Sequence, residues 1–568
     1  MNSGFPLDRR AVLGGLTALL GAGLAHALPG AARAATCPNA CRSMIGADDA
    51  WIRGLPIIDA HCHIFNARDI PAIRFITKVF LPGYAPELSA ANRRKLESEI
   101  VSTMAGTLWR TPGYEQEKAV LEARLAGEAE AAALQGEVEL PAFAHGSARS
   151  CYGADVADNI TAVRNLVTIL TGFRHKNFET LMVTNESRIP GVGVSLFTPA
   201  MVDMDYWLGV GGEDAAGVGD FGTDAFSLRQ TSPARQVELM EMIQRLYPAR
   251  CHGFVSFCPW RQTDDTHFNA LVGEESPRRR QTALETVQDA ILNRGFAGVK
   301  LYPPMGYYPL GNASLPIDGF PPAAARTPYA AEFGRRLDAA LLALYEFCAE
   351  NDVPVMTHTA PSKGAGVFKV TEDRLIPYET RAHPKGWARV LARPGLSGLR
   401  VNLAHFGGGH DPKVTQDWRE AIGMLMDTYP NVYSDLSHYP EMLMDNYTGT
   451  GQHCREAAET LEPIRKGFLG GAAGARRVKR MLYGSDWSML SKEYYYADYL
   501  PVVAHMYRRK IYGIGKGAKA SARAFLAGNS VSFLGLRPGD KARARLEAWY
   551  AGHGLDAGLL KRFDVAGE

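Results

Sequence analysis

The chain lacks the cysteine patterns that mark small disulfide-bonded or zinc-binding modules. Only 8 of its 568 residues are cysteine, and none forms a Cys-x-x-Cys pair. The spacings fit neither a zinc knuckle nor a dense disulfide framework. Cys37 and Cys41 could pair in an oxidising compartment, whereas Cys251, Cys258 and Cys348 lie in apolar surroundings and should be small buried side chains. A chain of this length can build a core without disulfide bonds.

Other absences narrow the function. The formal net charge is only +2, so no strong field draws nucleic acid or an anionic membrane to the chain. No basic stripe for nucleic acid is present. No Gly-x-Ser-x-Gly motif occurs, which argues against a serine hydrolase. What is there is an ordinary globular composition, 46% hydrophobic and 21% charged, without repeats or low-complexity tracts.

The first 34 residues have the pattern of an export signal. A twin-arginine signature, Asp8-Arg9-Arg10-Ala11-Val12-Leu13, begins a mild apolar stretch that reaches Leu28, and Ala32-Arg33-Ala34 is a small-x-small cleavage pattern. The apolar stretch is short and ends at Pro29-Gly30, which disfavours a stable membrane anchor. We therefore expect a signal peptide at 1–34, the twin-arginine export machinery as a partner, and a periplasmic or secreted protein.

Short β-branched segments alternate with longer amphipathic ones from Leu55 onward, which is typical of repeated βα units. The predicted strands are Pro56–His63, Val192–Phe197, Gly253–Cys258, Gly298–Tyr302, Val353–His358, Arg400–His405, Val432–Leu436 and Arg480–Tyr483. Helix-like stretches between them include Arg280–Asn293, Tyr329–Glu350, Lys413–Thr428 and Glu456–Phe468. Eight such units predict an α/β fold, a (β/α)8 TIM barrel over 50–540, with a C-terminal helical tail at 541–568. A doubly wound open sheet is the competing fold.

One gap interrupts this alternation. About 125 residues separate the first two predicted strands, far more than a βα unit requires. Lys95–Gln135 is helix-like there, and Val163–Arg174 is a second amphipathic candidate. We expect a long helical insertion at about 67–190. It would either cap the catalytic face, where the chain leaves the first strand, or form a peripheral helical layer.

The first predicted strand ends in two histidines. In Asp59-Ala60-His61-Cys62-His63, alternation places Asp59, His61 and His63 on one face of the strand and Cys62 on the other. Two neighbouring imidazoles on one face make half of a metal site. A pair of satisfied core histidines has the same pattern, so this motif alone is ambiguous.

Four later strands also end in a possible ligand: Lys300, His358, His405 and Asp486. Each has a simpler explanation when taken alone, as a core histidine, a snorkelling lysine or a helix N-cap. In a barrel, however, the carboxyl ends of all the strands surround one pocket, where such enzymes keep their active sites. The joint occurrence of these residues therefore favours a common site.

Together these motifs resemble the amidohydrolase superfamily, and more closely its amidohydrolase family 2 branch, over roughly Leu55 to Leu536. The matching segments are Asp59–His63 for strand 1, Ala404–Gly408 for strand 6, Asn431–Ser437 for strand 7, Leu482–Trp487 for strand 8 and Phe525–Leu536 for the closing segment. The resemblance implies a divalent metal, usually zinc, held by His61, His63 and Asp486, with His358 or His405 completing the shell. It also implies that Asp486 accepts a proton from water.

The number of metal ions is left open by this resemblance. Lys300 lies in Lys300-Leu301-Tyr302-Pro303, which looks like the strand 4 segment of dihydroorotase-type members, where a carboxylated lysine bridges two ions. In that case His358 and His405 would bind the second ion. In single-metal members the strand 6 histidine, here His405, activates water or orients the substrate. Neutral imidazoles with a carboxylate suit Zn²⁺ in either arrangement.

Other residues near the strand ends could line a substrate pocket: Trp260, Arg261, Tyr302, Lys363 and His438. Arg261 or Lys363 could bind a substrate carboxylate, and Tyr302 could form part of an aromatic wall. Solvated loops with scattered aromatic residues would explain each of them equally well.

The resemblance implies a metal-dependent hydrolase that acts on an amide, ester or lactone bond of a small molecule. A nonoxidative decarboxylase of an aromatic or unsaturated acid is the main alternative, and a noncatalytic, metal-containing periplasmic binding protein is another. Lys300 and the export signal favour hydrolysis. No motif names the substrate, since specificity resides in the loops. A homo-oligomer would be ordinary for this architecture.

Overall fold

The computed structural model describes residues 52–75, 111–127, 168–185, 192–208, 231–361, 367–371, 374–408, 412–439, 468–490, 499–506 and 516–567. The expected signal peptide at 1–34, Cys37, Cys41, Lys363 and much of the expected insertion lie outside these residues. Those expectations stay predictions.

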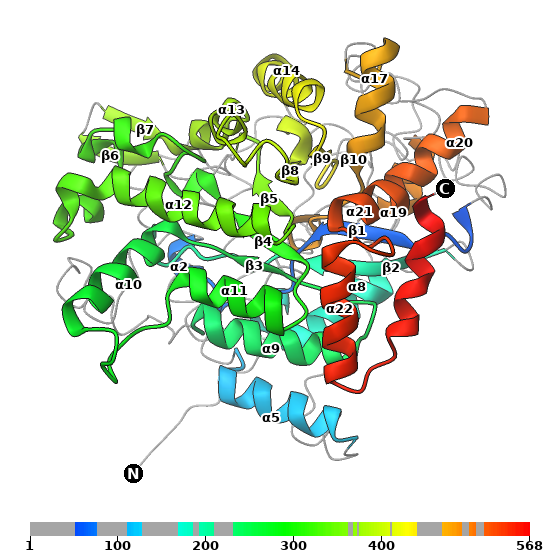
Figure 1. Cartoon of the computed structure of the whole chain (residues 1–568), viewed down its shortest axis with the longest axis horizontal. Helices are drawn as coiled ribbons and strands as arrows, with labels where there is room; N and C mark the ends of the chain where they lie inside the picture. The colour runs from blue at the N-terminus through cyan, green and yellow to red at the C-terminus, as the bar shows by residue number, and fades with distance from the viewer. Residues whose placement is uncertain are drawn as a thin grey trace, which may run out of the picture.

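Within the described residues, eight strands that pair in parallel form the centre of the fold. Figure 1 shows how they lie among the helices. Strands β1 (Ile57–Cys62) and β2 (Val194–Pro199) pair in one sheet, and a second sheet has the order β10-β9-β8-β5-β4-β3. Its members are β3 (Phe254–Ser256), β4 (Gly298–Leu301), β5 (Val355–His358), β8 (Val401–Ala404), β9 (Val432–Asp435) and β10 (Met481–Leu482). Each predicted strand is present, and each end lies within two residues of the predicted one.

The two sheets meet at both edges without forming one continuous ladder. On one side, isolated parallel bridges join Phe197 to Cys251 and Ala200 to Phe254. On the other, the amide of Ala60 donates to the carbonyl of Tyr483, and the amide of Asp486 donates to the carbonyl of His61. The mixed α/β fold with parallel strands is therefore confirmed, but the closed barrel expected from the sequence is not formed as a single sheet. Short edge strands such as β10 leave the ladder interrupted.

Helices cover the outside of the strands (Figure 1). The longer ones are α9 (Pro233–Leu246), α10 (Pro259–Val272), α11 (Ala283–Asn293), α12 (Phe333–Glu350) and α14 (Pro412–Thr428). Local sequence sets several starts: Ser232 caps α9, with Pro233 in its first turn, and Thr282 and Glu285 form a reciprocal capping box on α11. Within the part of the chain that the structure describes, no helix is both long and apolar enough to cross a membrane.

The C-terminal segment completes the interior of the fold. Helix α22 (Lys541–Gly552) and the 3₁₀ segment η18 (Ala557–Gly567) follow α21 (Asn529–Leu534). Their buried side chains Tyr550 and Phe563 belong to the same apolar cluster as Ile58 of β1, Phe254 of β3 and Met356 of β5. The tail is helical, and its buried side chains share this apolar cluster with the strand residues.

A buried charged cluster ties the loop after β1 to two helices within the expected insertion range, α5 (Tyr114–Leu125) and α8 (Arg174–Thr184). The guanidinium of Arg174 pairs with both Asp69 and Glu117, and its Nε lies 2.7 Å from Asp69 Oδ2. Asn66 Nδ2 also donates to Glu117, at 2.9 Å. All four residues are buried. Since Asn66 is three residues beyond His63, this cluster fixes the chain close to the strand end.

We expect Arg174→Met to destabilise the fold by about 3–5 kcal/mol, because it would leave two buried carboxylates without their cation. Urea unfolding followed by circular dichroism would measure this change. Arg335→Met is the matched control, because Arg335 is exposed and its ion pair with Glu332 is screened by water. An equally small change in both variants would contradict a stabilising role for the cluster.

Candidate metal centre

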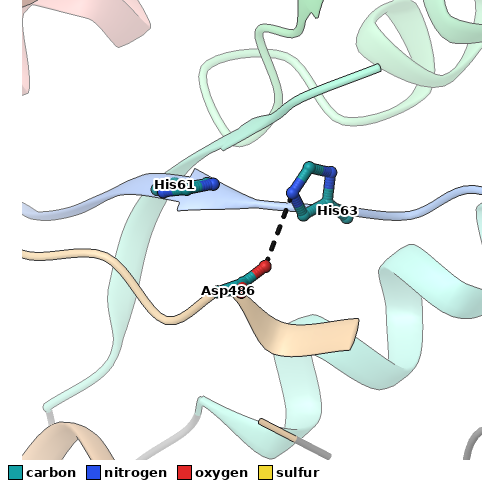
Figure 2. Close-up of side chains that lie close together, drawn as sticks. All are labelled: His61, His63 and Asp486. Carbon is teal, nitrogen blue, oxygen red and sulfur yellow. Dashed lines mark ion pairs between the residues drawn. The ribbon is translucent and has the colours of Figure 1, made fainter. Parts of the chain in front are cut away.

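His63 and Asp486 face each other in the centre of the candidate site (Figure 2). The Nδ1 of His63 donates to the carbonyl oxygen of Ala200 at 2.6 Å, which leaves Nε2 as an acceptor. That Nε2 lies 3.4 Å from Oδ1 of Asp486. Burial lowers the pKa of His63 to about 3, against the opposing effect of Asp486, so the imidazole is neutral at pH 7. Two acceptors in this position require a cation or a proton between them.

The Gly-Ser-Asp motif after β10 delivers Asp486 to this position. A Cβ on Gly484 would lie 2.9 Å from Cβ of His61 and 3.1 Å from Cβ of Ser437, so only glycine allows this close approach. Ser485 donates to Asp59 through its hydroxyl at 2.6 Å and its amide at 3.0 Å. Asp486 then adopts a left-handed backbone, with φ of +49°. Left-handed non-glycine residues cluster at functional sites, where the surrounding structure holds them in place.

Asp486 is buried but stays ionised. Burial raises the pKa of its carboxyl group, but His63, His61 and His405 lower it by more, and the resulting pKa is below the ordinary value. A buried carboxylate surrounded by imidazoles is the ligand combination that Zn²⁺ takes in proteins.

Lys300 of β4 points into the same cluster and does not reach solvent. Its Nζ lies 2.9 Å from Nε2 of His61 and 3.3 Å from Sδ of Met356. Burial lowers the pKa of Lys300 to about 8, against the opposing effects of Asp486 and Asp435. The amine occupies a place beside His61 where the neighbouring carboxylates favour positive charge.

His358 and His405 lie beside the other histidines. Their ring centroids are 4.5 Å apart, and those of His61 and His405 are 4.8 Å apart. Burial, and then the neighbouring His405, lower the pKa of His358 well below its ordinary range; burial and His61 lower that of His405 to about 4. Nε2 of His358 is buried without a hydrogen-bond partner. An orphaned buried acceptor of this kind calls for a ligand.

The residues present therefore fit a divalent metal ion. His61, His63 and Asp486 each offer a ligand atom, and these atoms lie within 4.8 Å of one another. His358 lies next to this group, with its ring centroid 4.5 Å from that of His405. Neutral imidazoles with one carboxylate suit Zn²⁺ and related ions. The fold brings the predicted ligands together at one place: His61, His63, Lys300, His358, His405 and Asp486. Their roles stay predictions.

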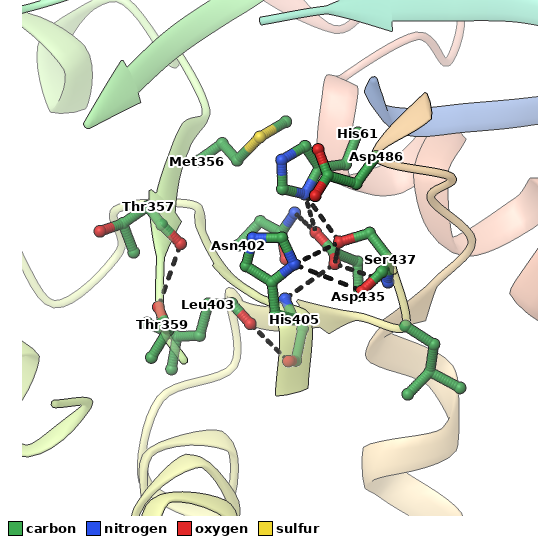
Figure 3. Close-up of polar contacts among 12 residues, drawn as sticks. His61, Met356, Thr357, Thr359, Asn402, Leu403, His405, Asp435, Ser437 and Asp486 are labelled. Atoms are coloured by element: carbon green, nitrogen blue, oxygen red, sulfur yellow. Dashed lines mark hydrogen bonds and ion pairs between the residues drawn. The ribbon is translucent and has the colours of Figure 1, made fainter. Parts of the chain in front are cut away.

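Sequence reasoning missed Asp435, the last residue of β9. It lies beside His61 and His405, and these three residues also have ligand-type atoms within 4.8 Å of one another (Figure 3). The available signal was its position, because Asp435 ends a predicted strand as the other candidates do. Its neighbour Ser437 has its hydroxyl 2.9 Å from Nδ1 of both histidines.

The predicted substrate residues lie at different distances from this cluster. The ring centroid of Tyr302 is 4.8 Å from that of His358. His438 follows β9 in a left-handed backbone conformation and is partly buried. Trp260 packs edge-on against Trp207 in the apolar core. Arg261 is held by two carboxylates, with 2.6 Å from Nε to Asp203 Oδ2 and 2.7 Å from an Nη to Asp205 Oδ2.

Comparison with protein families supports the amidohydrolase superfamily expected from the motifs. The family model described as Amidohydrolase matches residues 276–536. This segment begins after β3 and contains Lys300, His358, His405 and Asp486. His61 and His63 lie outside it, so their part in the site rests on the geometry. No curated protein matches the chain significantly.

Several solved structures are similar over much of their length. An uncharacterised TIM-barrel protein from Bordetella bronchiseptica is 17% identical, with 65% of this chain and 83% of that one covered and a TM-score of 0.32. A probable 2-pyrone-4,6-dicarboxylic acid hydrolase from Acinetobacter baumannii is 15% identical, with 60% and 84% covered and a TM-score of 0.26. The 5-carboxyvanillate decarboxylase LigW from Sphingomonas paucimobilis is 13% identical, with 68% and 92% covered and a TM-score of 0.30. TM-scores this low do not establish a common fold.

We expect His63→Ala and Asp486→Asn each to weaken Zn²⁺ binding by at least about 100-fold, because each removes a candidate metal ligand rather than an outer partner. Competition with a chromogenic chelator would measure the dissociation constants. His383→Ala is the matched control, since His383 forms a solvent-accessible pair with Asp417, 2.9 Å apart. Unchanged affinity in the first two variants would exclude this pair of residues from the metal site.

Proposed function

We propose that this chain is a metal-dependent hydrolase of the amidohydrolase superfamily, and that it attacks the carbonyl carbon of a small-molecule amide, ester or lactone. The observation that carries the proposal is the pair of facing acceptors, His63 Nε2 and Asp486 Oδ1, 3.4 Å apart. A divalent cation between them would satisfy both. The amidohydrolase match over residues 276–536 supports the same reading.

We also propose that the eight strands act as one (β/α)8 barrel. Their spatial order follows the chain order, and bridges link β2 to the region of β3. Backbone hydrogen bonds link β1 to the segment after β10. Active sites in such barrels lie at the carboxyl ends of the strands, where His61, Lys300 and His358 lie.

His61, His63 and Asp486 would hold the ion, and His358 would add a fourth ligand through its orphaned Nε2. We propose Zn²⁺ because three imidazoles and a carboxylate suit it. When bound, such an ion would act as a Lewis acid that polarises a substrate carbonyl and lowers the pKa of water, so that hydroxide is available as the nucleophile at neutral pH.

Two residues of the chain would handle protons and orientation. Asp486, kept ionised by the surrounding histidines, accepts the proton of the attacking water and returns it to the leaving group. His405 is neutral at pH 7, because burial and then His61 lower its pKa to about 4. It therefore presents a lone pair that accepts a hydrogen bond from water or substrate, and Tyr302 flanks the neighbouring His358.

We expect Asp486→Asn to lower kcat by about 10²–10⁴-fold on any substrate that the wild-type protein turns over, since a general base contributes rate factors of this size. Amides, esters, lactones and aromatic carboxylates would be assayed with and without a chelator, with acid release and CO₂ release measured in parallel. His383→Ala serves as the control and should retain full activity.

Each other result would point to a different function. Release of CO₂ without hydrolysis would make the protein a decarboxylase. Stoichiometric metal binding without turnover of any substrate class would favour a binding protein. Full turnover by both Asp486→Asn and His63→Ala would rule out the metal mechanism.

We further propose that Lys300 becomes carboxylated and bridges two ions, because its buried Nζ contacts His61 and faces the carboxylates of the cluster. In this two-ion form His358 and His405 would bind the second ion, whereas in the one-ion form His358 completes the shell and His405 contacts water or substrate. We expect about two Zn²⁺ per chain when bicarbonate is supplied and about one when CO₂ is removed. Lys300→Met should bind one ion under both conditions. Elemental analysis would measure the metal content, and a bicarbonate-independent single ion in the wild-type protein would contradict the bridge.

A further inference from the structure

Asp435 is saturated with hydrogen-bond donors (Figure 3). Its Oδ1 accepts from the amide of His405 at 2.9 Å, the amide of Ser437 at 3.1 Å and the hydroxyl of Ser437 at 2.5 Å. Its Oδ2 accepts from Nδ2 of Asn402 at 2.7 Å and lies 3.1 Å from Nδ1 of His61. Five donors from four residues therefore converge on one fully buried carboxylate.

The direction of the Ser437 hydroxyl follows from this arrangement. A carboxylate can only accept, so the single proton on Ser437 Oγ points to Asp435. What Ser437 Oγ offers to its other neighbours is therefore a lone pair. Those neighbours are Nδ1 of His61 and Nδ1 of His405, each 2.9 Å away.

Both imidazoles must then carry their proton on Nδ1. Around Nδ1 of His61 lie Asp435 Oδ2 and Ser437 Oγ, and both are acceptors. Around Nδ1 of His405 lie Ser437 Oγ and, at 3.3 Å, the carbonyl oxygen of Ser437, which are acceptors too. A neutral imidazole protonated at Nδ1 has its lone pair on Nε2. In His61 that Nε2 faces Lys300, inside the cluster.

We propose that Asp435 and Ser437 are positioning residues that lock His61 and His405, which come from two different strands, in the tautomer whose Nε2 can bind a metal. This inference rests on the proposed metal centre. Outer-shell carboxylates commonly orient metal-binding histidines in this way. Here one aspartate and one serine at the end of β9 control two imidazoles together.

Asp435 is therefore not a ligand of a second ion, although its oxygen lies close to two histidine nitrogens. Both of its oxygens are already occupied by donors, and the His61 nitrogen that it approaches is Nδ1, which carries a proton. A metal at that place would have to displace the proton of His61 and the hydrogen bond from Asn402.

Asp435→Asn should shift the tautomer of His61 without a steric change. The amide oxygen would take the place of Oδ1, where three donors converge, and the NH₂ group would take the place of Oδ2. Oδ1 of Asn402 is buried without a partner, so a flip of the Asn402 amide would let it accept from the new NH₂ group. The same NH₂ group faces the proton on Nδ1 of His61 and disfavours it, while Ser437 Oγ and the Lys300 amine still favour the Nδ1–H form, so the share of the Nε2–H tautomer should rise.

The test measures the tautomers first in metal-free protein. Side-chain ¹⁵N NMR of histidine-labelled, full-length protein reports which ring nitrogen carries the proton, and the His61→Gln variant assigns the signal of His61. We expect an Nδ1–H pattern in the wild type and a clearly larger Nε2–H share in Asp435→Asn. Chelator competition should show a Zn²⁺ dissociation constant about 10–100-fold higher in Asp435→Asn. Asp417→Asn, at the exposed pair with His383, is the control and should change neither quantity.

Two results would overturn the proposal. One is an unchanged His61 tautomer in Asp435→Asn; the other is the loss of one bound ion while the remaining ion keeps its affinity, which would make Asp435 a ligand. If Asp435→Asn does not fold, Ser437→Ala tests the same pair, and an unchanged Zn²⁺ dissociation constant would overturn it. A wild-type protein that binds no Zn²⁺ but shows the Asp435-dependent switch would refute the proposed function and support the positioning role.

Discussion

A carboxylate buried at the end of a strand loses its water, and this loss is costly unless hydrogen-bond donors or a cation replace it. Three buried aspartates surround the candidate site: Asp59 within β1, Asp435 at the end of β9 and Asp486 after β10. Ser485 and the amide of His61 donate to Asp59, and five donors surround Asp435. Asp486 faces a neutral imidazole instead, because Nδ1 of His63 donates elsewhere. The need for a cation is therefore concentrated at Asp486.

The same requirement explains why distant segments meet here. The hydrogen bonds of Asp59 hold the Gly-Ser-Asp segment against β1, and those of Asp435 hold the ends of β8 and β9 against it. Gly484 is needed because His61 and Ser437 approach it so closely. Packing, charge neutralisation and histidine orientation are thus parts of one arrangement, and a change in one of them would disturb the others.

Local pattern was sufficient to predict the strands and most helices. Strands such as Val401–Ala404 are short apolar segments, and α14 has one apolar face, so both have a clear period. The interrupted ladder between β1 and β10 was not predictable, because pairing of short strands depends on tertiary packing.

Histidine and lysine at strand ends were recognisable as ligand types. Asp435 was missed because its role arises from partners on β1 and β8. The engagement of Arg261 by Asp203 and Asp205 likewise depends on a loop brought near by folding.

The seam between β1 and the segment after β10 has a consequence for how the protein is made. The hydrogen bond between Asp59 and Ser485 joins residues 426 positions apart in the chain. Contacts of such long sequence separation form late, because the entropy of closing the intervening chain must be overcome first. The N-terminal histidines must therefore wait for nearly the whole polypeptide to leave the ribosome before their carboxylate partner exists. The site can be completed only once the chain has been made past Asp486, so shorter products of synthesis would lack it however well their first strands had folded.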